Sequence, residues 1–67
     1  MTKTFTVAIM REEDWFIAKC VENGVTSQGE SIDEAIENLK EAIELFYEDE
    51  QIPEFSQTFL TTLEVAI

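Results

Sequence analysis

The sequence predicts an α+β fold with the order β-β-β-α-β, in which one helix packs on an antiparallel meander. Three observations predict it: polar and apolar side chains alternate near both ends of the chain, turn residues separate short apolar runs, and one helix start is clearly marked. With 67 residues the chain has room for one domain, which we expect to span residues 1–67.

The first three strands follow from the spacing of the apolar residues. Alternation runs through residues 3–10, and residues 15–21 are rich in aromatic and aliphatic side chains. The polar residues 11–14 lie between them, which indicates a hairpin. A turn at residues 22–24 then leads into a short third strand at residues 25–28.

A single helix is predicted to begin after Ser31. Ser31 and Glu34 form a capping box: the Glu34 amide donates to the Ser31 hydroxyl, and the Glu34 carboxylate accepts from the Ser31 amide. The helix must end before Pro53, which disfavours helical geometry at the preceding residue. At about 100° per residue its apolar side chains share one face, which we expect to lie on the sheet. The centre of this face is formed by Ile32, Ile36, Leu39, Ile43 and Phe46, and it is flanked by Ala35, Ala42 and Tyr47.

The final segment, residues 58–67, alternates again and predicts a fourth strand. One face would carry Phe59, Leu63, Val65 and Ile67, and the other Thr58, Thr62 and Glu64. The complete prediction is therefore a four-stranded meander-type sheet with one helix.

The charge of the chain restricts its partners. Fifteen acidic residues face four basic ones, for a net charge of -11. Phosphate backbones and anionic membranes would be repelled, because binding to nucleic acids depends on Lys and Arg neutralising phosphates. We expect a basic protein as partner, and no direct contact with nucleic acid or membrane.

The residues needed for several chemistries are missing from the sequence. Histidine is absent and cysteine occurs once, which excludes histidine-based catalytic triads, the common zinc sites and an intrachain disulfide. Cys20 lies in an apolar stretch, residues 15–21, so we expect it to be structural. We expect no enzymatic activity, no metal and no cofactor. The N-terminus does not resemble a signal peptide and no apolar run could span a bilayer, which favours a cytoplasmic protein.

Two features are candidates for partner binding. The first is an acidic helix face at alternating spacings of three and four, where like charges disfavour the helix: Glu34, Glu37, Glu41, Glu44 and Glu48. This face either only keeps the protein soluble or docks a basic protein. The second is Trp15, which follows a charged turn and is either a core residue, the more common setting, or an exposed interface anchor.

Residues 27–43, SQGESIDEAIENLKEAI, resemble the HicB-like family of antitoxins. The shared pattern is a small polar residue, Gln-Gly, a polar residue, a Ser or Thr cap, and a helix containing Glu-Ala, Glu-Asn and Lys-Glu-Ala-Ile. Upstream, residues 14–20, DWFIAKC, resemble the second strand of the family. The resemblance covers residues 3–48. Two departures are local: Val21 replaces the usual proline after the cysteine, and the turn before Trp15 lacks glycine.

The resemblance implies a partial RNase H-like fold without the catalytic carboxylates of RNase H. It also implies a function, which is to bind and mask HicA, a small basic toxin that cleaves mRNA. Many members carry a C-terminal segment that binds operator DNA; residues 1–67 include no such segment, so the resemblance does not extend to autorepression.

Our expectation is an antitoxin-type protein-binding module that occludes a HicA-like toxin, with the acidic helix face and Trp15 as its contacts. The alternative is a stand-alone HicB-like oligomeric scaffold or ligand-binding domain without a toxin. In either case we expect a homodimer or higher homo-oligomer, because a small meander leaves sheet edges unpaired.

Overall fold

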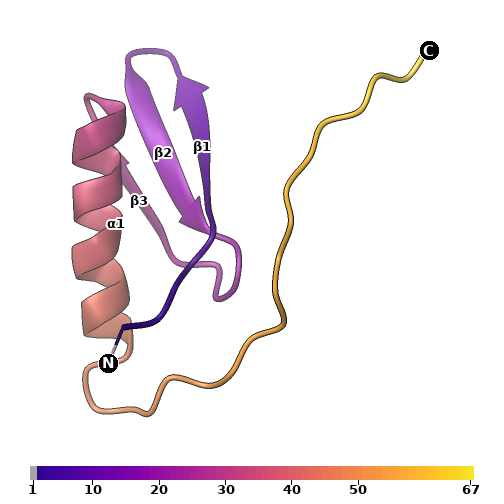
Figure 1. Ribbon diagram of the computed structural model, residues 1–67. Helices are drawn as coiled ribbons and strands as arrows, with labels where there is room; N and C mark the ends of the chain where they lie inside the picture. Colours follow the sequence, from indigo (N-terminus) through magenta and orange to yellow (C-terminus); the bar gives the residue numbers. More distant parts are fainter. Residues whose placement is uncertain (1) are drawn as a thin grey trace.

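The computed structural model describes residues 2–67; the first residue of the expected domain lies outside this range. It contains three antiparallel strands followed by one helix (Figure 1). The elements are β1 (Val7–Glu12), β2 (Trp15–Cys20), β3 (Thr26–Gly29) and α1 (Ile32–Phe46). The predicted α+β class, a meander with one helix packed on it, is confirmed.

The register of the sheet decides which side chains meet the helix. The strand order is β1-β2-β3, with Ala18 of the central strand opposite Ile9 on one side and Ser27 on the other. Ala18 and Cys20 are completely buried against α1. Because side chains alternate along a strand, Trp15 and Ile17 point to the opposite face, which α1 does not cover.

The core is small and lies between β2 and α1. Its buried side chains are Ala18, Cys20, Ala35, Leu39 and Ile43. Partly buried apolar side chains surround this cluster, among them Phe5, Val7, Ile9 and Tyr47. The buried position of Cys20 confirms its predicted structural role.

The buried face of α1 is rotated from the predicted one. Leu39, Ile43 and the flanking Ala35 are buried as expected, but Ile32, Ile36 and Phe46 are exposed. The cause is the position of the helix, which packs on β3 and β2. A small side chain at Ala35 allows close approach there, and the side of α1 that carries Ile36 is left uncovered.

The helix begins as predicted, with one change in the capping bonds. The Glu34 amide donates to the Ser31 hydroxyl over 3.1 Å. The Glu34 carboxylate accepts from the amide of Glu30 at 3.0 Å, one residue earlier than the box predicts. The helix ends at Phe46, and a turn follows it well before Pro53.

The first strand begins later and continues further than predicted. It starts at Val7, and it pairs with β2 up to Glu12 opposite Trp15, so that the hairpin loop consists of Glu13 and Asp14 alone. Glu13 has a φ of 53°, the left-handed conformation that glycine adopts most easily. The loop thus requires this conformation at the turn where the sequence lacks glycine.

The prediction of a fourth strand is wrong for this chain. Within residues 2–67, no strand pairs with residues 58–67, which run extended and exposed beside the folded body (Figure 1). The chain just before them is held against the N-terminal segment, where Lys3 pairs with Glu54 at 3.2 Å and the rings of Phe5 and Phe55 meet edge to face. Alternation was present in this segment, but a strand also needs a neighbour for its backbone groups.

In the part of the chain that the structure describes, no helix has the length and apolar character to cross a membrane.

Candidate partner-binding surfaces

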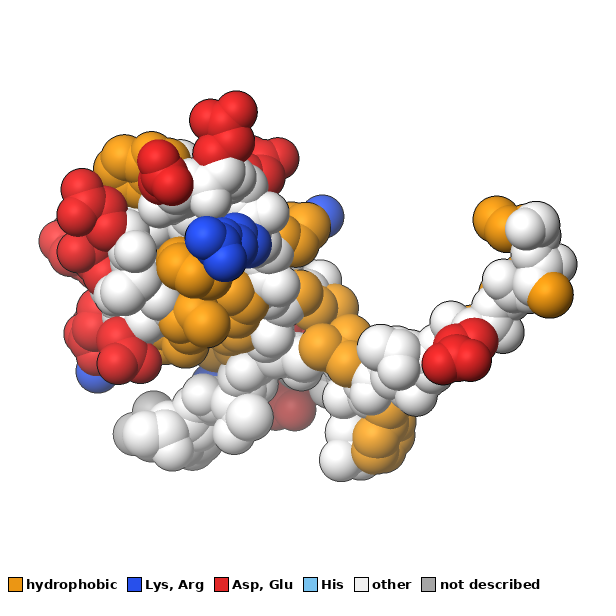
Figure 2. Space-filling view, turned by 90° about the horizontal axis from the view of Figure 1, so that it is seen from above, with side chains coloured by type: hydrophobic (Ala, Val, Ile, Leu, Met, Phe, Trp, Pro, Cys, Tyr) orange, Lys and Arg blue, Asp and Glu red, His pale blue; other side chains and the backbone are white. Residues whose placement is uncertain are grey.

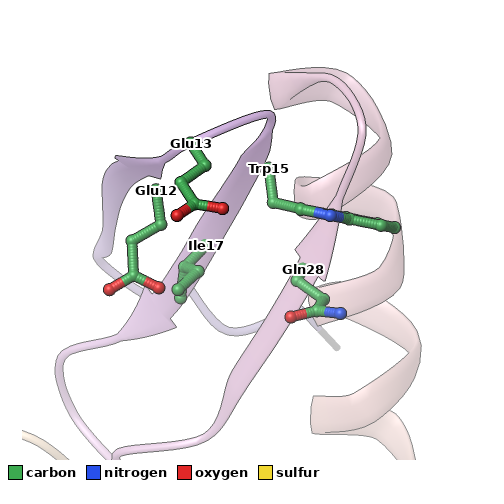
Figure 3. A pocket seen from close by; sticks show the side chains of 5 residues that line it. All are labelled: Glu12, Glu13, Trp15, Ile17 and Gln28. Carbon is green, nitrogen blue, oxygen red and sulfur yellow. The ribbon is translucent and has the colours of Figure 1, made fainter.

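Two surfaces emerge from the fold, and they lie on opposite sides of the sheet. One is the outer face of α1, where acidic side chains gather on the helix side of the molecule (Figure 2). The other is the uncovered face of the sheet, which carries Trp15 (Figure 3). The two predicted contacts are therefore separate places on the protein.

The acidic face of α1 is fully accessible. All five predicted glutamates are exposed: Glu34, Glu37, Glu41, Glu44 and Glu48. Among residues 2–67 the one ion pair joins Lys3 to Glu54, so none of the five glutamates forms an ion pair with a described base. Lys40, one turn from both Glu37 and Glu44, is the one base on α1. The last turn of α1 also carries no basic residue. This face is a surface of unbalanced negative charge.

The two ends of this face differ from its centre. Glu34 uses its carboxylate to cap the Glu30 amide. Glu48 lies beyond the end of the helix, in a turn where its amide bonds to the Leu45 carbonyl. The regular helical part therefore presents Glu37, Glu41 and Glu44, which we name the central acidic triad.

Trp15 is not a core residue, so the more common of its two settings is wrong here. It is 42% exposed and its ring extends from β2 across β3 (Figure 3). The reason is strand alternation: Ala18 and Cys20 occupy the face that meets α1, which places Trp15 on the face without a helix. Its exposure fits the alternative interpretation, an interface anchor.

Trp15 lies in a shallow hollow on this open face. The hollow is lined by Glu12, Glu13, Trp15, Ile17 and Gln28 (Figure 3). Glu12 and Glu13 lie on the β1 side of this hollow, and the indole ring extends in the opposite direction, toward β3 (Figure 3). Carboxylates attract cationic groups and the face of an indole ring binds them, so both ends of the hollow suit a basic side chain. The chemistry of the hollow therefore matches a basic partner too.

The sequence reasoning missed the neighbours of Trp15. Ile17 lines the same hollow, and Met10, directly opposite Ile17 on β1, is also exposed. The signal was present in the alternation of residues 15–20, which separates Trp15 and Ile17 from the buried residues. The single helix was predicted, but both sides of residues 15–20 carry apolar side chains, so the pattern does not say which side the helix covers.

One carboxylate has a structural use instead. Glu22 accepts a 2.8 Å hydrogen bond from the Thr6 amide, and the Cys20 thiol lies 3.7 Å from the same oxygen. The Thr6 amide lowers the pKa of Glu22, because its hydrogen bond stabilises the ionised carboxylate. Glu22 thus fastens the segment that enters β1.

The carboxylates do not converge. In residues 2–67, no three His, Cys, Asp or Glu side chains come close enough together to hold a metal ion. The acidic side chains of α1 point outward from a convex surface. What the arrangement offers chemically is contact with cationic groups on another molecule.

Comparison with known proteins gives a family but no activity. The sequence pattern of DUF7387, described as a family of unknown function, matches residues 3–65, which is nearly the whole chain. Searches of curated proteins and of solved structures gave no significant match.

Proposed function

The chain belongs to this family of unknown function, and we propose that it is an antitoxin-type protein-binding module that neutralises a small basic toxin which cleaves mRNA. The observation that carries the proposal is the central acidic triad, which is exposed and forms no ion pair with a described base. The resemblance of residues 27–43 to HicB-like antitoxins supports it, and suggests a HicA-like toxin as the partner.

The mechanism would be occlusion. An enzyme that cleaves mRNA must present Lys and Arg side chains to phosphates. Glu37, Glu41 and Glu44 offer carboxylates to the same side chains, in charge-assisted hydrogen bonds. Like charge within the triad is relieved when a basic surface arrives, and the net charge of -11 speeds the encounter. The protein would act in the cytoplasm, where mRNA is found.

The hollow around Trp15 is a second contact for the same kind of partner. It combines an exposed indole with the carboxylates of Glu12 and Glu13. Because it lies on the other face of the sheet, a small toxin bound to α1 would leave it free. A toxin with an extended basic segment, or a second toxin, would be needed to occupy it.

One observation favours the alternative of an oligomeric scaffold without a toxin. The apolar side chains of residues 59–67 are exposed in the single chain. Exposed apolar segments of this kind mark contacts with other chains. A scaffold role needs no basic partner, so the two functions are separated by a binding experiment.

The test compares two variants with the same change in net charge. The triad variant carries Glu37→Lys and Glu41→Lys, and the control carries Asp49→Lys and Glu50→Lys, beyond the helix. The probe is the purified small basic protein encoded beside this gene, or a HicA-like toxin where none is present. The readouts are affinity by calorimetry and protection of an mRNA from cleavage.

We expect the triad variant to bind the toxin at least tenfold more weakly than the control, a loss of about 1.4 kcal/mol in binding free energy. Added salt should weaken the binding of the unaltered protein. Equal affinity of both variants would move the contact away from α1. Absence of binding and of protection in the unaltered protein would reject the antitoxin function and favour the scaffold.

A further inference from the structure

Within residues 2–67, the segment at residues 58–67 alternates like a strand but pairs with no other strand. Phe59 is 80% exposed and Leu63 is 78% exposed, and both lie on the same side of the alternating pattern as Val65. This segment extends outward from the folded body (Figures 1 and 2). Its backbone groups and apolar side chains both require a partner.

The sheet has one edge that can accept such a segment. In the described part of the chain, the outer edge of the six-residue strand β1 pairs with no other strand. The other edge, β3, has four residues, and its Gln28 carbonyl already accepts a hydrogen bond from the Asn38 side chain. The free edge of β1 is therefore the longer and less obstructed of the two.

An apolar groove lies next to β1 on the helix side. It is open because α1 packs on β2 and β3, and Ile36 on its flank is 41% exposed. The groove is lined by Lys3, Phe5, Val7, Ile36, Lys40 and Ile43, together with Glu44. A strand added to β1 would place every second side chain over this groove.

The low charge of residues 55–67 also favours this segment for contact between two copies of the chain. Each copy has a net charge of -11, so most of its surface repels a second copy. Residues 55–67 contain one of the fifteen acidic residues, Glu64, and are the least charged part of the chain. The groove that would receive them has two of the four bases, Lys3 and Lys40, in its lining.

In the structure, residues 58–67 leave their own β1 edge unpaired. Residues just before the segment are fixed against the N-terminal segment by the Lys3 to Glu54 ion pair and the Phe5 to Phe55 ring contact. From there the chain departs from its own β1 edge (Figure 1). The groove is thus left open to another molecule.

We propose that residues 58–67 of one copy add as a strand to the free edge of β1 in a second copy, and that the exchange is reciprocal. Phe59, Leu63 and Val65 would fill the groove over Ile36. Each copy would then provide the fourth strand that the other lacks. This inference does not depend on the toxin, and it names the surface of the homodimer.

The experiment uses two leucine variants of the full-length protein. Leu63→Ser removes an apolar side chain from the groove-facing side, and Leu60→Ser makes the same change on the opposite side of the segment. Both residues are exposed in the single chain, so neither change should unfold it; circular dichroism checks this. Sedimentation over micromolar concentrations gives the dimer dissociation constant.

A dimer that weakens at least tenfold with Leu63→Ser, and less than threefold with Leu60→Ser, supports the proposal. In a mixture of isotope-labelled and unlabelled protein, Leu63 methyl groups should show intermolecular contacts to those of Val7 and Ile36. A folded monomer overturns it, whether or not residues 58–67 pair within the chain. A dimer that is indifferent to Leu63→Ser also overturns it and points to the open sheet face.

Salt separates this inference from the proposed function. The dimer joins two chains of like charge, so added salt should strengthen it, whereas toxin binding should weaken. A dimer that forms without any toxin activity would retain the strand exchange and reject the antitoxin. Toxin binding by a folded monomer would retain the antitoxin function and reject the strand exchange.

Discussion

The side-chain amide of Asn38 donates a 2.9 Å hydrogen bond to the main-chain carbonyl oxygen of Gln28. The bond connects the middle of α1 to the edge strand β3, ten residues earlier in the chain. Both residues belong to the segment that resembles HicB-like antitoxins. The bond gives Asn38 a structural role on a helix that is otherwise acidic on its outer side.

Replacement of Asn38 tests this bond. Asn38→Ala should lower the free energy of unfolding by about 0.5 to 1.5 kcal/mol. Asn38→Asp should cost more at neutral pH, because a carboxylate cannot donate to the Gln28 carbonyl and adds a like charge near Glu34 and Glu41. The gap between the variants should narrow near pH ~3, where the new carboxyl is protonated. Urea unfolding at neutral pH and near pH ~3 measures this difference in stability. If Asn38→Asp were as stable as Asn38→Ala at neutral pH, the hydrogen bond from Asn38 to Gln28 would be contradicted.

Gly29 is required by the close approach of β3 to the start of α1. A Cβ at this position would lie 2.6 Å from the amide nitrogen of Ala35 and 2.9 Å from the Glu34 carbonyl carbon, both backbone atoms. Gly29→Ala should therefore destabilise the fold by about 1 to 3 kcal/mol, since the strand and helix must separate. Gly24→Asn is the control, because Gly24 has open space around it and Asn tolerates its positive φ of 78°. Thermal unfolding compares the two variants. Equal unfolding midpoints would show that α1 can move away from β3 at little cost in free energy.

The start of α1 was predictable because capping depends on residues adjacent in sequence. Ser31 caps the Glu34 amide as expected, and the acidic residues fall on the outer face as their spacing requires. These features need no knowledge of distant parts of the chain. The strands β2 and β3 were found for the same reason, since turns at both ends delimit them.

What could not be predicted is which face of the sheet the single predicted helix covers. Both sides of β2 carry apolar side chains, and α1 covers the side of Ala18 and Cys20, which leaves Trp15 exposed. Because α1 packs on β2 and β3, Ile36 lies on an open flank of the helix. Residues 58–67 carry the pattern of a strand, but the pattern does not say which chain supplies its neighbour.

The hairpin between β1 and β2 should be open to improvement. Glu13 adopts a φ of 53°, which costs a residue with a Cβ about 1 kcal/mol or more. Glu13→Gly should stabilise the protein by about 0.5 to 1 kcal/mol, because relief of this strain exceeds the added freedom of the unfolded chain. Asp14→Gly, at the adjacent loop position without positive φ, should instead destabilise it. Urea midpoints of the two variants should move in opposite directions.

The Glu22 carboxylate should make stability depend on acid pH. Its pKa is lower in the folded chain than in the unfolded chain, because the Thr6 amide donates to it. Its contribution is therefore present above the unfolded pKa and is lost as pH falls through the folded pKa. Glu22→Gln should be less stable than the unaltered protein at neutral pH, with the difference shrinking in acid. A carbon-detected NMR titration should place the Glu22 pKa below its ordinary value; a value at or above it would rule out the bond to Thr6.

Glu41, at the centre of the acidic triad, should weaken its own helix in the absence of a partner. Glu41 has like-charged neighbours at Glu37 and Glu44, and each such pair costs a few tenths of a kcal/mol. Glu41→Lys replaces both repulsions with attractions, so the isolated protein should gain about 0.5 to 1.5 kcal/mol at low salt. In 1 M salt most of this gain should vanish, because the Debye length falls to about 3 Å. Glu50→Lys makes the same change in net charge outside the helix and should give a smaller gain. If both variants are stabilised equally, the repulsion belongs to the whole chain of charge -11 and the triad has no stored energy for a basic partner to release.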